Sequence, residues 1–74
     1  MSGPLSAVSA RQIIRLLRSR GFVQTRQSGS HAIFRHPDGR GTTVPIHANR
    51  DLGRGLLRQI MRDANLTLED LRRG

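Results

Sequence analysis

Apolar residues recur at helical spacing near the start of the chain. Four of them fall at the i, i+3 and i+4 positions that share one face of an α-helix. They are Ile13, Ile14, Leu16 and Leu17. Ser9 stands where an N-cap belongs, and Gly21 stands where a C′ glycine ends a helix. Because the opposite face carries Arg11, Arg15 and Arg18, the pattern predicts an amphipathic helix with a basic outer side.

A second helical pattern covers roughly residues 53–64 and is followed by Asn65, a residue suited to a helix stop. Its expected apolar face consists of Leu56, Leu57, Ile60 and Met61. The other face carries three arginines spaced four apart, which are Arg54, Arg58 and Arg62. Thr67 then begins a short helical turn whose first residues include Glu69 and Asp70, where the helix dipole favours acidic side chains.

Between the two helices, the pattern predicts three strands at about 22–27, 30–36 and 40–47. Turn residues separate them: Ser28-Gly29 at the first junction and Pro37-Asp38-Gly39 at the second. A proline at position 45 indicates an edge strand or a bulge, because proline cannot donate to the ladder. The predicted class is therefore α+β, in the order α-β-β-β-α with a short C-terminal helix. Two helices would cover one face of a three-stranded antiparallel sheet and leave the other face open.

The second turn also predicts the strand register. A three-residue loop at 37–39 places His36 opposite Arg40. The set expected to face the helices is then Ser30, Ala32, Phe34, Thr42, Val44 and Ile46. The set expected on the open face is His31, Ile33, Arg35, Thr43, Pro45 and His47. His31 and His47 would be one diagonal step apart, about 7–8 Å.

Composition narrows the class of protein further. The 74 residues suffice for one small domain, predicted to span 9–74 after a disordered leader at 1–8. Without cysteine there is no disulfide framework, which fits a reducing cytoplasm, and no apolar run is long enough for a membrane span. All 13 basic residues are arginines, and the net charge of +8 predicts a polyanionic partner: nucleic acid, an acidic protein, or both.

Among the candidate chemical groups, His31 stands out. It follows a Gly29-Ser30 pair, is expected on the open face, and lies among arginines. In RNA cleavage, an imidazole can accept the 2′-hydroxyl proton or protonate the leaving oxygen, and arginines can stabilise the charge on phosphorus. The simpler alternative is a surface histidine without a role. His47 is expected to be a strand-end residue, with a second acid or base as the alternative, and His36 is expected to pack beside the turn.

The arginine stripe on the second helix has two open interpretations: a solvated helix face, or a track for phosphates. The candidate RNA contacts are Arg26, Arg35, Arg50, Arg54 and Arg58. A metal site is not expected, since His36 would point away from the other two histidines and no cysteine is present. No cofactor is expected either.

Five segments in order resemble the HicA toxin family, small bacterial mRNA interferases with a double-stranded-RNA-binding-like fold. They are a helix ending in GF, the RQSGSHAIFRHPDGR hairpin, the TVPIH strand, the DLGRGLLRQIMRDANL helix and the LTLEDL ending. The resemblance extends from Ser9 to Leu71. It implies a ribonuclease acting on mRNA, with His31 as the catalytic residue and Gly29 and Ser30 presenting it. It also implies a HicB antitoxin that binds the toxin and blocks access to that histidine.

The sequence is consistent with three alternative functions. The leading hypothesis is a metal-independent endoribonuclease toxin that uses His31 and is neutralised by HicB. The alternative is a non-catalytic basic module that binds RNA and blocks translation by occupancy, in which His31 has no role. The third is a protein-interaction domain whose basic face serves only an acidic partner.

Overall fold

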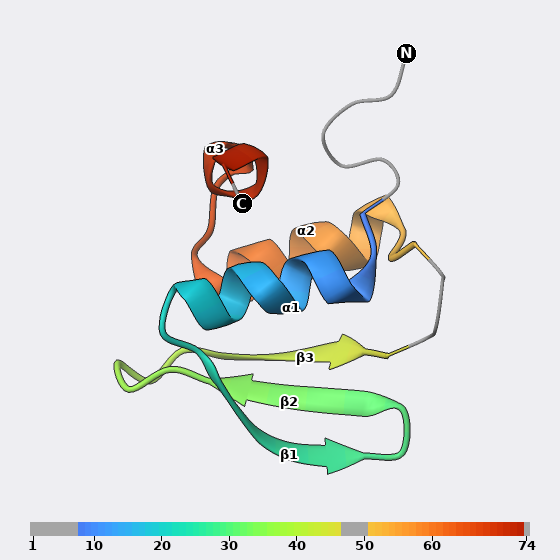
Figure 1. The fold of residues 1–74 in the computed structure, drawn as a ribbon, viewed down its shortest axis with the longest axis vertical. Coiled ribbons are helices and arrows are strands. Elements are labelled where there is room, and N and C mark those ends of the chain that lie inside the picture. Colours follow the sequence, from blue (N-terminus) through green and yellow to red (C-terminus); the bar gives the residue numbers. More distant parts are fainter. Residues whose placement is uncertain (1–7, 47–50, 74) are drawn as a thin grey trace.

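The computed structural model describes residues 8–46 and 51–73. The elements follow one another as α1 (Ala10–Ser19), β1 (Val23–Ser28), β2 (His31–Arg35), β3 (Gly41–Pro45), α2 (Arg54–Ala64) and α3 (Leu68–Arg73). The three strands form one antiparallel sheet in the order β1-β2-β3. In Figure 1, β3 lies nearest the helices and β1 lies farthest from them. The predicted α+β class and element order are confirmed.

Both predicted ends of α1 are confirmed. Ser9 is the N-cap, and it forms a capping box in which its hydroxyl accepts from the backbone N–H of Gln12 while the Gln12 side chain accepts from the N–H of Ser9. At the other end, Gly21 adopts a left-handed φ of +92°. The N–H of Gly21 bonds to the carbonyl of Arg18, and the N–H of Phe22 bonds to the carbonyl of Leu17. This pair of bonds is the Schellman motif, which satisfies the last carbonyls of the helix.

The predicted register of β2 and β3 is also confirmed. Ala32 pairs with Val44, and Phe34 pairs with Thr42. The 37–39 turn closes as a three-residue loop, because the N–H of His36 bonds to the carbonyl of Arg40 across 2.8 Å. These inner-face residues are buried, and β3 is an edge strand, as the proline at position 45 indicated.

The hydrophobic core lies between the inner face of β2 and β3 and the two longer helices. Its largest fully buried side chains are Phe34, Ile13, Leu16, Leu17, Leu57, Ile60 and Val44. β1 contributes no buried residue, so the helices cover only part of the sheet. The strand begins at Val23 rather than at Phe22, whose buried ring belongs to the core before the strand starts.

The start of the chain differs from the expectation at one described residue. Residues 1–7 of the predicted leader lie outside the described part, but Val8 is only 6% exposed. Its carbonyl accepts a hydrogen bond from the N–H of Leu52, and Ser9 forms an antiparallel bridge with Asp51. The segment before α1 therefore pairs with the segment before α2, and Val8 belongs to the folded domain.

Two predicted core residues are at the surface. The pattern predicts Leu56 on the buried face of α2, but it is 38% exposed, while Leu57 and Ile60 are fully buried. The apolar stripe of this helix is wider than the surface it packs against. The register predicts Ile46 on the inner face, but it follows the end of β3 and is 36% exposed, because the packed inner face ends with Val44.

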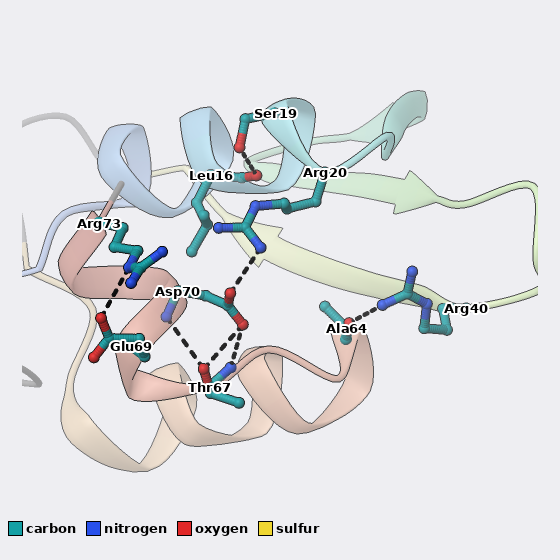
Figure 2. A network of polar contacts seen from close by, with 9 residues as sticks. All are labelled: Leu16, Ser19, Arg20, Arg40, Ala64, Thr67, Glu69, Asp70 and Arg73. Atoms are coloured by element: carbon teal, nitrogen blue, oxygen red, sulfur yellow. Dashed lines mark hydrogen bonds and ion pairs between the residues drawn. The ribbon is translucent and has the colours of Figure 1, made fainter.

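Helix α3 is held against the rest of the domain by polar contacts (Figure 2). Thr67 caps the helix, and its backbone N–H donates to the Asp70 carboxylate. Asp70 also accepts from Nη1 of Arg20, at the end of α1, across 2.7 Å. The Thr67 N–H bond first, and the Arg20 guanidinium second, lower the pKa of Asp70 to about 2. Nearby, Arg40 donates to the carbonyl of Ala64 and so links the 37–39 turn to the end of α2.

Candidate active site

His31 is the first residue of β2 and follows a two-residue turn. That turn consists of Gly29 and Ser30, the residues expected to present the histidine, and it joins the paired residues Ser28 and His31. Gly29 has a φ of +58°, which glycine adopts readily at the first central position of such hairpin turns. The Gln27 side chain donates to the Gly29 carbonyl across 3.2 Å and ties the turn to β1.

The imidazole of His31 is exposed on the face of the sheet that points away from the helices, as predicted. Its cross-strand neighbours are Ser28 on one side and Pro45 on the other. Among the described residues, none forms a hydrogen bond or an ion pair with its side chain. Both ring nitrogens therefore remain available, within this part of the chain, to exchange a proton with a bound molecule.

Arg26 lies on the same face of the sheet as His31, directly after a β-bulge in β1. Thr25 is the extra residue in β1: Gln24 pairs with Phe34, but Arg26 pairs with Ile33. The two-residue turn pairs Ser28 with His31, and because side chains alternate along a strand, Arg26 points to the same side as Ser28, independently of the bulge before it. Directly paired residues share a face, so Arg26 lies next to Ile33 on the side of His31.

Arg35 is the second cation on this face. It is exposed and pairs with Gly41 at the start of β3. A Cβ at position 41 would lie 3.1 Å from Cδ of Arg35, so the arginine side chain lies directly over the glycine. The missing side chain at Gly41 thus allows Arg35 to cross β3 toward α2.

The open face continues around the edge of β3 into a cleft of about 570 Å³, here called the β3 cleft. Its sheet side includes His31, Ile33 and Arg35.

The helix side of the β3 cleft comes from α2, and the sequence patterns did not identify it. It consists of Leu56, Gln59 and Asp63, which recur at the i, i+3 and i+7 spacing of one helical face. This spacing is the available signal, but the helical pattern also places Leu56 on the face expected to be buried. The cleft combines an imidazole, a guanidinium, apolar side chains, an amide and a carboxylate within reach of a single bound molecule.

The other sequence candidates lie elsewhere. The arginine stripe of α2 is exposed and forms no ion pair within the described residues, so it gives the helix a basic outer face. It consists of Arg54, Arg58 and Arg62. None of the three lines the β3 cleft; Arg58 and Arg62 border a separate hollow beside α3. His47 and Arg50 lie outside the described residues.

His36 packs beside the turn, as predicted. Its Nδ1 accepts from the N–H of Asp38 across 3.1 Å, and its ring meets the Phe22 ring edge-on at 5.0 Å. Its Nε2 lies against Gly21, where a Cβ would approach to 2.9 Å. The residue therefore has a structural role. In residues 8–46 and 51–73, no three histidine or acidic side chains come together as metal ligands.

The sequence matches the family model described as the HicA toxin of bacterial toxin–antitoxin systems over residues 10–66. The chain belongs to the HicA toxin family. This membership makes it a toxin of a toxin–antitoxin system. The matched region runs from the first residue of α1 to just beyond α2, so it includes the whole β3 cleft of this HicA toxin and excludes α3. No curated protein matches the sequence. No helix in the described residues is long and apolar enough to cross a membrane.

Proposed function

We propose that this HicA-family toxin is a metal-independent endoribonuclease that cleaves mRNA in the cytoplasm, with His31 as its acid or base. One observation carries the proposal: an exposed imidazole, without an internal hydrogen-bond partner in the described residues, shares one sheet face with two arginines in a chain of net charge +8. A phosphodiester is a substrate that this combination suits.

The reaction requires a proton to move at each end of the scissile phosphate. The RNA 2′-oxygen attacks phosphorus and loses its proton, and the 5′-oxygen of the next nucleotide leaves and gains one. The products are a 2′,3′-cyclic phosphate and a 5′-hydroxyl, and no cofactor enters the balance. Neutral His31 can accept the first proton, and the imidazolium form can supply the second.

Arg26 and Arg35 have the complementary task. Charge builds on the non-bridging oxygens as phosphorus becomes five-coordinate, and a guanidinium can donate to two of these oxygens at once. Both arginines are on the face of His31, because Arg26 pairs with Ile33 and Arg35 lies four residues after His31 on β2. Electrostatic attraction by the basic chain would also concentrate RNA at this face.

The same properties support neutralisation by a HicB-type antitoxin. A partner with an acidic surface would be attracted to a chain of net charge +8. Since His31 lies on an open strand face, a protein bound there would exclude RNA from the imidazole. Inhibition would then need no change in the toxin fold.

The decisive test compares the wild-type chain with His31→Ala and Gln24→Ala. Gln24 pairs with Phe34, so it lies on the sheet face opposite His31 and serves as the control. A structured mRNA is incubated with each protein in EDTA and run on a gel, and circular dichroism verifies folding. We expect cleavage by the wild type and by Gln24→Ala, with 5′-hydroxyl ends, and none by His31→Ala. RNA that is retained but uncut by all three proteins would instead establish a binding module that acts by occupancy.

A further inference from the structure

A short chain of hydrogen bonds fixes the helix side of the β3 cleft. Thr42, which is 6% exposed, donates its hydroxyl to Oδ2 of Asp63 across 3.0 Å. Nε2 of Gln59 donates to Oδ1 of the same carboxylate, also across 3.0 Å. A carboxylate only accepts, so the amide of Gln59 must turn its nitrogen toward Asp63 and its oxygen away. The cleft wall therefore presents acceptor oxygens in a fixed arrangement.

Part of the lining of the same cleft is apolar. Ile33 and Pro45 are half-buried, and Leu56 is 38% exposed although it is a large apolar residue. All three line the cleft together with His31. An apolar surface with a few fixed polar groups is the usual form of a small-molecule site, and a volume of about 570 Å³ falls within the ~300–1,000 Å³ typical of such sites.

The charges at the two sides of the cleft are opposite. Arg35 supplies a cation over the sheet, and Asp63 supplies an anion on α2. A nucleotide that entered would place its phosphate toward the arginine, because the carboxylate repels phosphate oxygens. Its base would then face Leu56, Gln59 and Asp63.

We infer that the β3 cleft is a base-binding subsite next to the scissile phosphate, in which Gln59 and Asp63 favour a base with an exocyclic amino group over uracil. This inference rests on the proposed ribonuclease function. Adenine, cytosine and guanine each offer an amino group that can donate to the Gln59 amide oxygen or to Asp63. Uracil offers one N–H between two carbonyl oxygens, and the carboxylate of Asp63 would repel these oxygens.

Two substitutions test the subsite without disturbing the core. Gln59→Ala removes the exposed amide that contacts the base. Asp63→Asn keeps the size of the side chain and one oxygen to accept from Thr42, but it replaces the oxygen that accepts from Gln59 with an amino group. The variant therefore removes both the charge of Asp63 and the contact by which Asp63 positions Gln59. The control is again Gln24→Ala, an amide on the opposite sheet face that does not line the cleft.

The experiment measures cleavage of short single-stranded RNAs that differ only in the nucleotides flanking the mapped cut. The readout is the ratio of the rates with an amino-bearing base and with uracil, which partial unfolding would not change. We expect the wild type and Gln24→Ala to prefer amino-bearing bases by about fivefold or more, as one good base contact provides. We expect Gln59→Ala and Asp63→Asn to bring the ratio close to one.

The possible failures are distinguishable. A wild-type chain that cleaves with no base preference, or variants that keep the wild-type ratio, would overturn the subsite and leave the ribonuclease intact. A wild-type chain that cleaves no RNA at all would overturn the proposed function, and the subsite with it.

Discussion

Arg26 lies directly opposite Ile33, one residue out of the register that Val23 and Gln24 set with β2. The extra residue, Thr25, donates its hydroxyl to the Ile33 carbonyl across 3.4 Å. Arg26 keeps the register that the Gly29-Ser30 turn sets, so its charge lies on the side of His31. The bulge changes the side of the residues before it: a regular strand would have paired Gln24 with Arg35 on the open face, whereas the bulge turns Gln24 to the inner face.

The two arginines of the open face should contribute to RNA binding through phosphate contacts. We expect Arg26→Ala and Arg35→Ala each to lower the slope of log affinity against log salt concentration by about 0.7, the change for one phosphate contact on a single strand. The measurement is fluorescence anisotropy with a labelled RNA, using protein that carries His31→Ala so that the RNA stays intact. Arg72, exposed on α3, is the control. Equal slopes for all variants would show that these arginines do not contact phosphate.

The hydroxyl of Thr42 should stabilise the junction between β3 and α2. It is buried and donates to Asp63, so Thr42→Val leaves the carboxylate with one bond fewer at almost constant volume. We expect the free energy of unfolding to fall by about 1–2 kcal/mol. Its neighbour Thr43 is exposed on the other face, so Thr43→Val should change the value by less than about 0.5 kcal/mol. Urea denaturation of both variants measures the difference, and similar losses would contradict the assignment.

Two glycines should respond to alanine in opposite directions. Gly21 has a φ of +92°, and a Cβ there would lie 2.9 Å from Nε2 of His36. Since the left-handed conformation alone costs about 1–2 kcal/mol for other residues, Gly21→Ala should destabilise by at least ~1 kcal/mol. Gly55, in α2, has nothing within 4 Å of its Cβ position. Gly55→Ala should therefore stabilise the helix by about 0.5–1 kcal/mol. Thermal denaturation tests both predictions: the melting temperature of Gly21→Ala should be below that of the wild type, and that of Gly55→Ala should be above it.

The Asp70 contacts should make the attachment of α3 sensitive to acid. The folded state lowers the pKa of Asp70 from 3.8 to about 2, so the folded state binds the proton less readily than the unfolded chain. The stabilisation is then complete above about pH 4 and is lost as the pH falls toward 2. We expect Asp70→Asn to lower the melting temperature at neutral pH and to approach the wild type near pH 2.

This comparison isolates Asp70 because the other carboxyls titrate in both proteins. Among them is Asp38, whose pKa is also lowered, mainly by the backbone N–H of Arg40. A gap in melting temperature that stays constant from neutral pH down to pH 2 would exclude a contribution from the Asp70 charge.

Much of the fold could be predicted because its signals are local. Ser9 and Gly21 mark the ends of α1 within a single helical turn, and Asn65 ends α2 in the left-handed conformation. The three-residue turn after His36 sets the register of β2 and β3, and register alone places His31 on the open face. These features depend on backbone preferences and hydrogen bonds between near neighbours, which a sequence displays directly.

The remaining features depend on which surfaces meet. Leu56 lies at the surface because the apolar stripe of α2 extends beyond the sheet that it covers, and no property of the helix alone sets that limit. Arg20 meets Asp70 across 50 positions in the chain, and Thr42 meets Asp63 across 21. The sequence by itself determined the elements, the hairpin and the position of His31, because short-range geometry controls them. Only the tertiary structure decided the bulge that turns Gln24 to the inner face and the helix side of the β3 cleft, because both arise from long-range packing.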